Sequence, residues 1–198
     1  MKCLVVVAHP QPDSLCRSLA RFAIARLEAA GHQVTVEDLY GEGFDAALTE
    51  AERRSYYAAA FDASSVAGEA ARLTGAEALV LVFPTWWYGF PAILKGWFDR
   101  VWSPGIAFDH ASNFGPIKPR LKLAHVLAVT TLGSPWWIDT LVLRQPVRRI
   151  LRIAILGACA RGVRFDMLSL HSAEKPAPER VTRFEGRIAA VLDRWPTR

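Results

Sequence analysis

Ala78-Leu79-Val80-Leu81-Val82-Phe83-Pro84-Thr85-Trp86-Trp87-Tyr88-Gly89-Phe90-Pro91 is the stretch of sequence that decides the fold. Its first six residues are apolar without interruption, which is typical of a strand buried on both faces of a parallel sheet. Residues 92–101 carry apolar side chains at helical spacing, so we expect a helix directly after the loop. Ligands of open α/β sheets bind at the carboxyl ends of the strands. We therefore interpret Trp86, Trp87 and Tyr88 as a platform for a planar cofactor, with a simple aromatic cap on the core as the alternative.

The rest of the chain alternates between strand and helix patterns. Strands are predicted over residues 3–8, 34–36, 123–130 and 163–170, and helices over residues 15–30, 147–155 and 179–195. A capping box at Thr49–Glu52 predicts a further helix through the Tyr56–Ala71 region, and residues 103–120 are expected to be irregular. The pattern predicts one α/β domain over residues 1–198. It is a flavodoxin-like, doubly wound, five-stranded parallel sheet in the order 2-1-3-4-5, within three layers.

The first strand is followed by His9-Pro10-Gln11-Pro12-Asp13-Ser14, a loop that leads into a helix. The first turn of a helix offers unpaired N–H groups and partial positive charge, which together bind phosphate. Ser14 or Asp13 fits the N-cap position, and His9 can donate a further hydrogen bond. Neither GxGxxG nor a Walker A lysine is present, so a simple cap with a structural His9 remains the alternative. In the order 2-1-3-4-5, this loop lies beside the aromatic loop.

A second loop with aromatic residues, residues 131–137, follows the fourth strand, so two such loops are expected to close over one ligand. In the helix predicted after it, the apolar stripe consists of Val147, Ile150, Leu151, Ala154 and Ile155. Arg148, Arg149 and Arg152 are expected opposite that stripe. They are interpreted as a solvated face, or as a surface that steers anionic cofactors or meets an acidic partner.

Composition excludes several classes of protein. The chain has 24 Lys and Arg against 19 Asp and Glu, but its arginines are scattered and match no nucleic-acid-binding module. Cys3, Cys16 and Cys159 lack the spacing of a metal site, which predicts no metal and a reduced, cytoplasmic protein. No signal peptide or transmembrane segment is expected.

Three segments resemble the flavodoxin-like NAD(P)H:quinone oxidoreductases, the DT-diaphorase group and its bacterial relatives. They are Ala8-His9 through Ser14, the loop from Asp38-Leu39-Tyr40 to Leu48-Thr49, and, most specifically, Phe83 through Val101. The similarity is clear from about residue 3 to residue 131 and thin afterwards. The resemblance implies a homodimer with a flavin in each of two sites near the interface, NAD(P)H as electron donor and a quinone-like acceptor.

The resemblance also implies which residues bind the flavin. The set is His9, Ser14, Leu15, Cys16, Pro84, Thr85, Trp86, Trp87, Tyr88, Gly89, Thr130, Thr131 and Gly133. FAD is favoured and FMN is the alternative. The family has Phe-Asn at Leu15-Cys16 and Gly at Leu132, and no catalytic acid is assigned, because a lone His171 at a strand end is more often structural.

In this hypothesis NAD(P)H passes hydride to the flavin and leaves, and a quinone then enters the same slot and is reduced by two electrons. Trp87 and Tyr88 would stack on the ring. Backbone N–H groups near Tyr88 and Gly89 would stabilise negative charge on the reduced flavin. The alternative function is a redox-sensing regulatory subunit of a potassium-efflux transporter.

Overall fold

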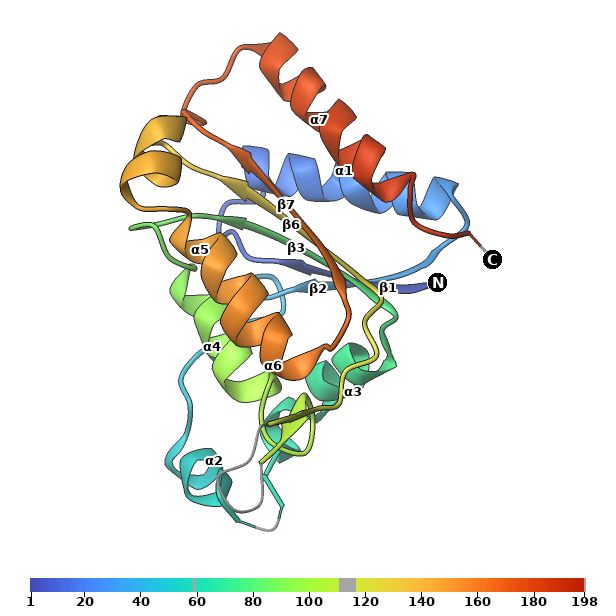
Figure 1. Ribbon diagram of the computed structural model, residues 1–198, viewed down its shortest axis with the longest axis vertical. Coiled ribbons are helices and arrows are strands. Elements are labelled where there is room, and N and C mark those ends of the chain that lie inside the picture. The colour runs from blue at the N-terminus through green and yellow to red at the C-terminus, as the bar shows by residue number, and fades with distance from the viewer. Residues whose placement is uncertain (59, 111–116, 198) are drawn as a thin grey trace.

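Five parallel strands form the centre of the protein, as a computed structural model that describes residues 1–58, 60–110 and 117–197 shows (Figure 1). The strands are Lys2–Val7 (β1), Gln33–Asp38 (β2), Ala78–Pro84 (β3), His125–Thr131 (β6) and Arg164–Leu170 (β7). Their order is β2-β1-β3-β6-β7, and every neighbouring pair is parallel. This is the predicted order 2-1-3-4-5, so the flavodoxin-like α/β fold is confirmed.

Helices cover both faces of the sheet (Figure 1). One face carries α1 (Leu15–Ala29) and α7 (Pro178–Leu192), and the other carries α3 (Ala67–Gly75), α4 (Ala92–Val101), α5 (Pro146–Arg149), η4 (Ile150–Leu156) and α6 (Gly157–Cys159). Every residue of β3 is buried. Leu79, Leu81 and Phe83 point into one apolar layer, and the residues between them point into the other. The continuous apolar run of β3 is thus explained by burial on both faces. Within the described residues, no helix has the length and hydropathy that a bilayer-crossing segment needs.

The predicted helix through the Tyr56–Ala71 region is wrong. The capping box at Thr49 is present, but α2 spans only Glu50–Ser55, and η1 (Ser64–Val66) separates it from α3. The Ser55 hydroxyl donates to the backbone oxygen of Glu52 and accepts from the Asp62 N–H, at 2.9 Å each. Such bonds between side chains and backbone offer the chain an alternative to further helical turns.

Two other expectations need correction. The segment 103–120, predicted to be irregular, contains a two-stranded antiparallel sheet of β4 (Phe108–Asp109) and β5 (Lys118–Pro119); residues 111–116 lie outside the described residues. The apolar stripe predicted at a 3.6-residue period is only partly buried, because η4 is a π-helix with a different period. Leu151 is buried there while Ile150 is 44% exposed. Arg149 and Arg152 are exposed, as expected of a solvated face, whereas Arg148 is half-buried with its guanidinium 5.9 Å from the centre of the Phe165 ring.

Helix α4 belongs to the segment that resembles the quinone oxidoreductases. Its residues hold neighbouring parts of the chain in place. A Cβ on Gly96 would lie 2.1 Å from the backbone oxygen of Ala46, so only glycine permits this close approach. The indole N–H of Trp97 donates to the fully buried carboxylate of Glu37 at 2.6 Å. These contacts fasten β2 and the segment after it against α4.

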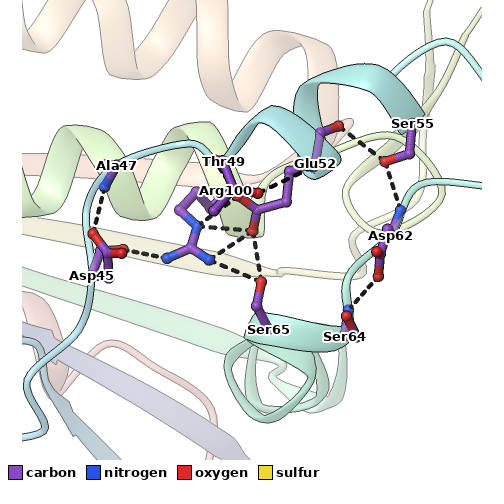
Figure 2. A network of polar contacts seen from close by, with 9 residues as sticks. All are labelled: Asp45, Ala47, Thr49, Glu52, Ser55, Asp62, Ser64, Ser65 and Arg100. Atoms are coloured by element: carbon purple, nitrogen blue, oxygen red, sulfur yellow. Dashed lines mark hydrogen bonds and ion pairs between the residues drawn. The ribbon is translucent and has the colours of Figure 1, made fainter.

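A buried ion pair joins α4 to α2 (Figure 2). The guanidinium of Arg100 donates to the carboxylate of Glu52 at 2.7 to 3.1 Å, and it also donates to the Ser65 hydroxyl and the Asp45 backbone oxygen. The two charged side chains are only 4% and 2% exposed. Burial alone would raise the pKa of Glu52. Hydrogen bonds from Arg100, from the backbone N–H of Thr49 and from Ser65 outweigh it and lower that pKa to about 2.

This depressed pKa predicts a specific loss of stability in acid. The ordinary pKa of the Glu52 carboxyl is 4.5, so its contribution is complete above that pH and is lost as pH falls toward about 2. The difference in free energy of unfolding between the wild type and Glu52→Gln should be constant above pH 4.5 and should shrink below it. Urea titrations at a series of pH values measure this difference. A difference that does not change with pH would show that the Glu52 carboxyl is not held in its charged form.

Candidate functional site

The loop after β1 leads into α1 as the sequence predicts. Ser14 is the N-cap residue, and its hydroxyl oxygen accepts from the Arg17 N–H at 3.3 Å. The N–H groups of Leu15 and Cys16, in the first turn of α1, have no acceptor within the described part of the chain. His9 accepts the Gln11 N–H on Nδ1 at 3.1 Å, so a neutral His9 carries its proton on Nε2. Burial and the nearby Arg17 charge lower the pKa of His9. The loop thus presents several hydrogen-bond donors to an anion.

Arg17 fixes the shape of this loop, a role that sequence reasoning missed. Its guanidinium donates to the backbone oxygen of His9 at 3.1 Å and to the carboxylate of Asp38 at 2.6 Å. Asp38 in turn accepts the Gly41 N–H at 3.0 Å. Arg17 therefore ties the ends of β1 and β2 to the start of α1. An arginine three residues after an N-cap is too common in sequences to signal this arrangement.

The aromatic loop after β3 is a tight reverse turn. Trp86 and Gly89 exchange two backbone hydrogen bonds, at 3.2 and 2.9 Å. The central residues, Trp87 and Tyr88, have φ values of 50° and 56°, as in a type I′ turn. Bulky residues rarely adopt this left-handed conformation, which costs about 1–3 kcal/mol per residue and is concentrated at functional sites. The Trp87 side chain is fully exposed.

The turn changes one detail of the predicted site. The N–H of Gly89 is used inside the turn, so it is not free to stabilise a reduced flavin as expected. The N–H groups of Trp87 and Tyr88 have no acceptor among the described residues. They are the donors that this loop can offer to a ligand.

The two loops meet at the carboxyl edge of the sheet. Residue Ala8 donates its N–H to the backbone oxygen of Val82 at 3.0 Å, and the rings of His9 and Trp86 pack edge to face with centres 6.1 Å apart. The ends of β3 and β6 are also joined, because the hydroxyls of Thr85 and Thr130 lie 2.7 Å apart. Residues predicted from three separate loops therefore come together on one edge, which lies on the left in Figure 1.

The loop after β6 borders the same edge. Leu132 donates its N–H to the backbone oxygen of Leu170 at 2.9 Å and accepts the Ala173 N–H at 2.8 Å. Gly133 lies so close to Glu174 that a Cβ would be 3.0 Å from its carboxylate. A narrow crevice there is lined by Thr85, Thr130, Leu132, Asp139, Gln145, Val147, Arg148, Met167 and Ser169. Asp139, Gln145 and Arg148 were not predicted as flavin-binding residues. They come from the short helix η3 (Ile138–Val142), the turn after it and α5, whose positions the sequence does not reveal.

His171 is not a lone histidine. Its Nε2 lies 3.2 Å from the carboxylate of Asp139, which is 6% exposed. His171 also lines a pocket of about 310 Å³ beyond the end of β7, together with Pro135, Trp136, Ser169, Leu170, Ser172, Arg180, Arg183, Phe184 and Arg187. Ser169 lines both this pocket and the narrow crevice, so the two hollows adjoin.

Three of the predicted flavin-binding residues cannot contact a ligand through an exposed side chain. Cys16 is 2% exposed and Thr130 is 1% exposed, and Pro84 is buried at the end of β3. Burial also raises the pKa of the Cys16 thiol to about 12, so it stays protonated. Cys16 and Pro84 can contribute only backbone groups to a site, and Thr130 can contribute only where it lines the narrow crevice.

The residues at this edge fit a flavin nucleotide. The unpaired N–H groups at the start of α1 and the His9 donor suit a phosphate. The exposed Trp87 face and the unpaired N–H groups of the strained turn suit a flat, polar-edged ring. The sheet is doubly wound, and a loop suited to phosphate and an aromatic loop meet at its topological switch point. This combination places the protein in the class of α/β proteins that bind nucleotide cofactors.

Within that class, the chain belongs to the family described as having a flavodoxin-like fold, whose family model matches residues 1–153. It is 34% identical over 149 residues to the ribosyldihydronicotinamide dehydrogenase [quinone] of Pongo abelii, which covers 67% of this chain and 64% of that protein. It is 29% identical over 219 residues to NAD(P)H dehydrogenase [quinone] 1 of Rattus norvegicus, covering 98% of this chain and 79% of that protein. The predicted resemblance to quinone oxidoreductases is thereby confirmed.

Solved structures extend the similarity beyond the clearly related region. An NAD(P)H:quinone oxidoreductase from Methanothermobacter marburgensis has a TM-score of 0.81 and 26% identity, covering 97% of this chain and 94% of that one. The chain spans 46% to 64% of the length of the first curated relatives that it matches.

Proposed function

We propose that the protein is a flavin-dependent NAD(P)H oxidoreductase that reduces quinones or similar electrophiles by two electrons. The observation that carries the proposal is the meeting of the His9 loop with the Trp86–Gly89 turn, where the two rings are 6.1 Å apart. The three relatives described above are named as dehydrogenases or oxidoreductases of quinones, which supports the proposal. They give no support to the alternative of a regulatory subunit.

The bound flavin would supply the chemistry, since it accepts a hydride from NAD(P)H and passes it to the acceptor. The chain's own residues bind and orient. The N–H groups of Leu15 and Cys16, with His9, would hold phosphate, and the Trp86–Gly89 turn would hold the ring. The N–H groups of Trp87 and Tyr88 would place partial positive charge beside the ring edge.

The purified protein should be yellow and should oxidise NADH or NADPH when a quinone is supplied. Because one slot would serve donor and acceptor in turn, double-reciprocal plots at several quinone concentrations should be parallel, as in ping-pong kinetics. Absorbance spectra and steady-state rates measure both properties. A colourless protein that takes up neither FAD nor FMN would refute the proposed function.

We favour FAD over FMN because of the 310 Å³ pocket that adjoins the narrow crevice at the carboxyl edge of the sheet. Its α7 wall carries Arg180, Arg183 and Arg187, which suit the second phosphate of a dinucleotide. Arg180 already donates to the backbone oxygens of His171 and Ser172, which leaves the other two side chains for a ligand.

This choice of cofactor predicts that Arg183→Gln weakens FAD binding about tenfold and leaves FMN binding unchanged, since one charge-assisted hydrogen bond contributes roughly 1.5 kcal/mol. Arg194→Gln, an exposed arginine just beyond the end of α7, is the matched control. Fluorescence titration of the flavin-free protein measures both affinities. Equal losses of affinity for FAD and FMN would show that Arg183 does not bind the second phosphate. Mass spectrometry of the cofactor released on denaturation tests directly whether it is FAD or FMN.

Two further properties belong to the proposal. The chain would act as a homodimer, which light scattering tests. It would reside in the cytoplasm, in keeping with the free, buried state of Cys3, Cys16 and Cys159.

A further inference from the structure

His171, just beyond the end of β7, lies between a buried carboxylate and a pocket rich in arginine. Its Nε2 atom is 3.2 Å from the carboxylate of Asp139, which is 6% exposed. The same histidine lines the pocket of about 310 Å³ to which α7 contributes Arg180, Arg183 and Arg187. His171 is therefore placed to respond both to Asp139 and to a ligand in the pocket.

The contact with Asp139 decides what His171 can offer to that ligand. An ionised carboxylate only accepts hydrogen bonds, so Nε2 carries a proton and donates to Asp139. In a neutral ring the other nitrogen, Nδ1, is then an acceptor, and its lone pair repels an anion. Only in the protonated ring does Nδ1 become a donor, and only then does His171 bring a positive charge to the pocket.

The charged groups around His171 act on its protonation in opposite directions. Asp139, from η3, favours the protonated ring, and the three arginines of α7 disfavour it. Among the described residues, no acidic side chain lines the pocket and offsets those arginines. Glu174 and Lys175, in the loop after β7, and Arg148, in the adjoining crevice, do not line it either.

An anion in the pocket would change this balance. Its negative charge would offset the arginines, which removes their effect on the ring, and it would also attract the charged form of His171 directly. The anion and the proton would then each raise the affinity for the other, as linkage requires. A diphosphate suits the pocket, because guanidinium groups bind phosphate oxygens through paired, charge-assisted hydrogen bonds.

We propose that His171 binds the diphosphate of FAD in its protonated form, so that the pocket takes up a proton as it fills. This inference rests on the proposed function, which places the second phosphate of FAD in that pocket, and it adds the residue that makes binding depend on pH. Histidine loses its charge between about pH 5 and pH 8, so the affinity for FAD should fall as pH rises through that range. Asp139 is a positioning residue, because it acts on the ligand only through His171.

Calorimetric titration of the flavin-free protein with FAD tests the proposal. Heats measured in two buffers of different ionisation enthalpy give the number of protons taken up, and the diphosphate diester of FAD does not itself titrate near neutral pH. The wild type should take up as much as about one proton. It should bind FAD about tenfold more tightly at about pH 6 than at about pH 8, the factor that one charge-assisted hydrogen bond contributes.

Two substitutions of His171 separate its charge from its shape. His171→Gln can still donate to Asp139 but cannot gain a charge, so it should bind FAD about tenfold more weakly than the wild type at about pH 6 and take up fewer protons. His171→Lys is charged throughout this range, so at about pH 8 it should bind FAD as tightly as the wild type does at about pH 6.

His125→Gln is the matched control. His125 is a buried histidine at the amino end of β6, at the opposite edge of the sheet, so this variant should take up as many protons as the wild type. His9 would respond to a flavin phosphate as well, but equally in the wild type and in His171→Gln. The difference between those two proteins therefore belongs to His171.

Several outcomes would overturn the proposal. One is equal proton uptake by the wild type and His171→Gln, and another is a His171→Lys variant that binds FAD no more tightly at about pH 8 than His171→Gln does. Equal losses of FAD and FMN affinity in His171→Gln at every pH would show that His171 only joins β7 to η3.

A measurement on the wild type alone keeps the test independent of how the variants fold. The NMR signals of the His171 ring should titrate at a higher pH with FAD than without it, and an unchanged titration would also refute the proposal. A protein that binds FAD and reduces quinones without proton uptake would contradict this inference and leave the proposed function standing. A protein that binds neither FAD nor FMN would refute both.

Discussion

Glu52→Ala is expected to lower the free energy of unfolding by about 3–5 kcal/mol, because it leaves the buried guanidinium of Arg100 without its counter-charge. The Arg100 side chain is 4% exposed, so water cannot replace the lost carboxylate without local unfolding. The substitution also removes one half of the capping box, since Glu52 accepts the Thr49 N–H at 2.7 Å. Urea denaturation of the wild type and the variant measures the difference.

Glu50→Ala is the matched control for this effect. Glu50 lies on the same short helix, but its ion pair with Arg54 is 79% exposed on both sides, so its loss should cost less than about 1 kcal/mol. Replacing both partners, with Glu52→Leu and Arg100→Met, should recover most of the stability, since no unpaired charge then remains buried. If Glu52→Ala were no more destabilising than Glu50→Ala, the buried pair would not be what holds α2 against α4.

The strand order and the meeting of the His9 loop with the aromatic turn could be predicted from the sequence, because both depend on strong local signals. The apolar run of β3 is unbroken, and the topology then places the His9 loop beside the aromatic turn. The helix after Thr49 could not be predicted correctly. Its capping box is a real signal, but Ser55 and Asp62 end it through bonds that depend on the folded loop.

The segment that most resembles the quinone oxidoreductases divides into two parts with different tasks. Its turn, around Trp87, faces outward, whereas Gly96, Trp97 and Arg100 hold neighbouring segments in place. A resemblance gives equal weight to all of these residues. Only the positions of Ala46, Glu37 and Glu52 show that the helical part serves structure.

Because the aromatic turn is strained, we expect one double substitution in it to raise the stability of the protein and to lower its affinity for flavin. Trp87→Asn with Tyr88→Gly supplies the residues that a type I′ turn prefers. The free energy of unfolding of the flavin-free protein should rise by about 1–3 kcal/mol, because the left-handed conformation no longer opposes a bulky side chain. Flavin affinity should fall about 30-fold or more, since two aromatic faces contribute roughly 2 kcal/mol of stacking and burial.

Trp87→Ala with Tyr88→Ala is the control that isolates the strain. Alanine removes the aromatic faces but still resists positive φ, so this variant should lose flavin affinity to the same degree without the gain in stability. Urea denaturation of the flavin-free proteins and fluorescence titration with flavin give the two quantities for each variant. An Asn-Gly variant that binds flavin as tightly as the wild type would remove Trp87 and Tyr88 from the site. One that is no more stable than the Ala-Ala variant would show that the turn, with φ of 50° and 56° at its centre, stores no strain.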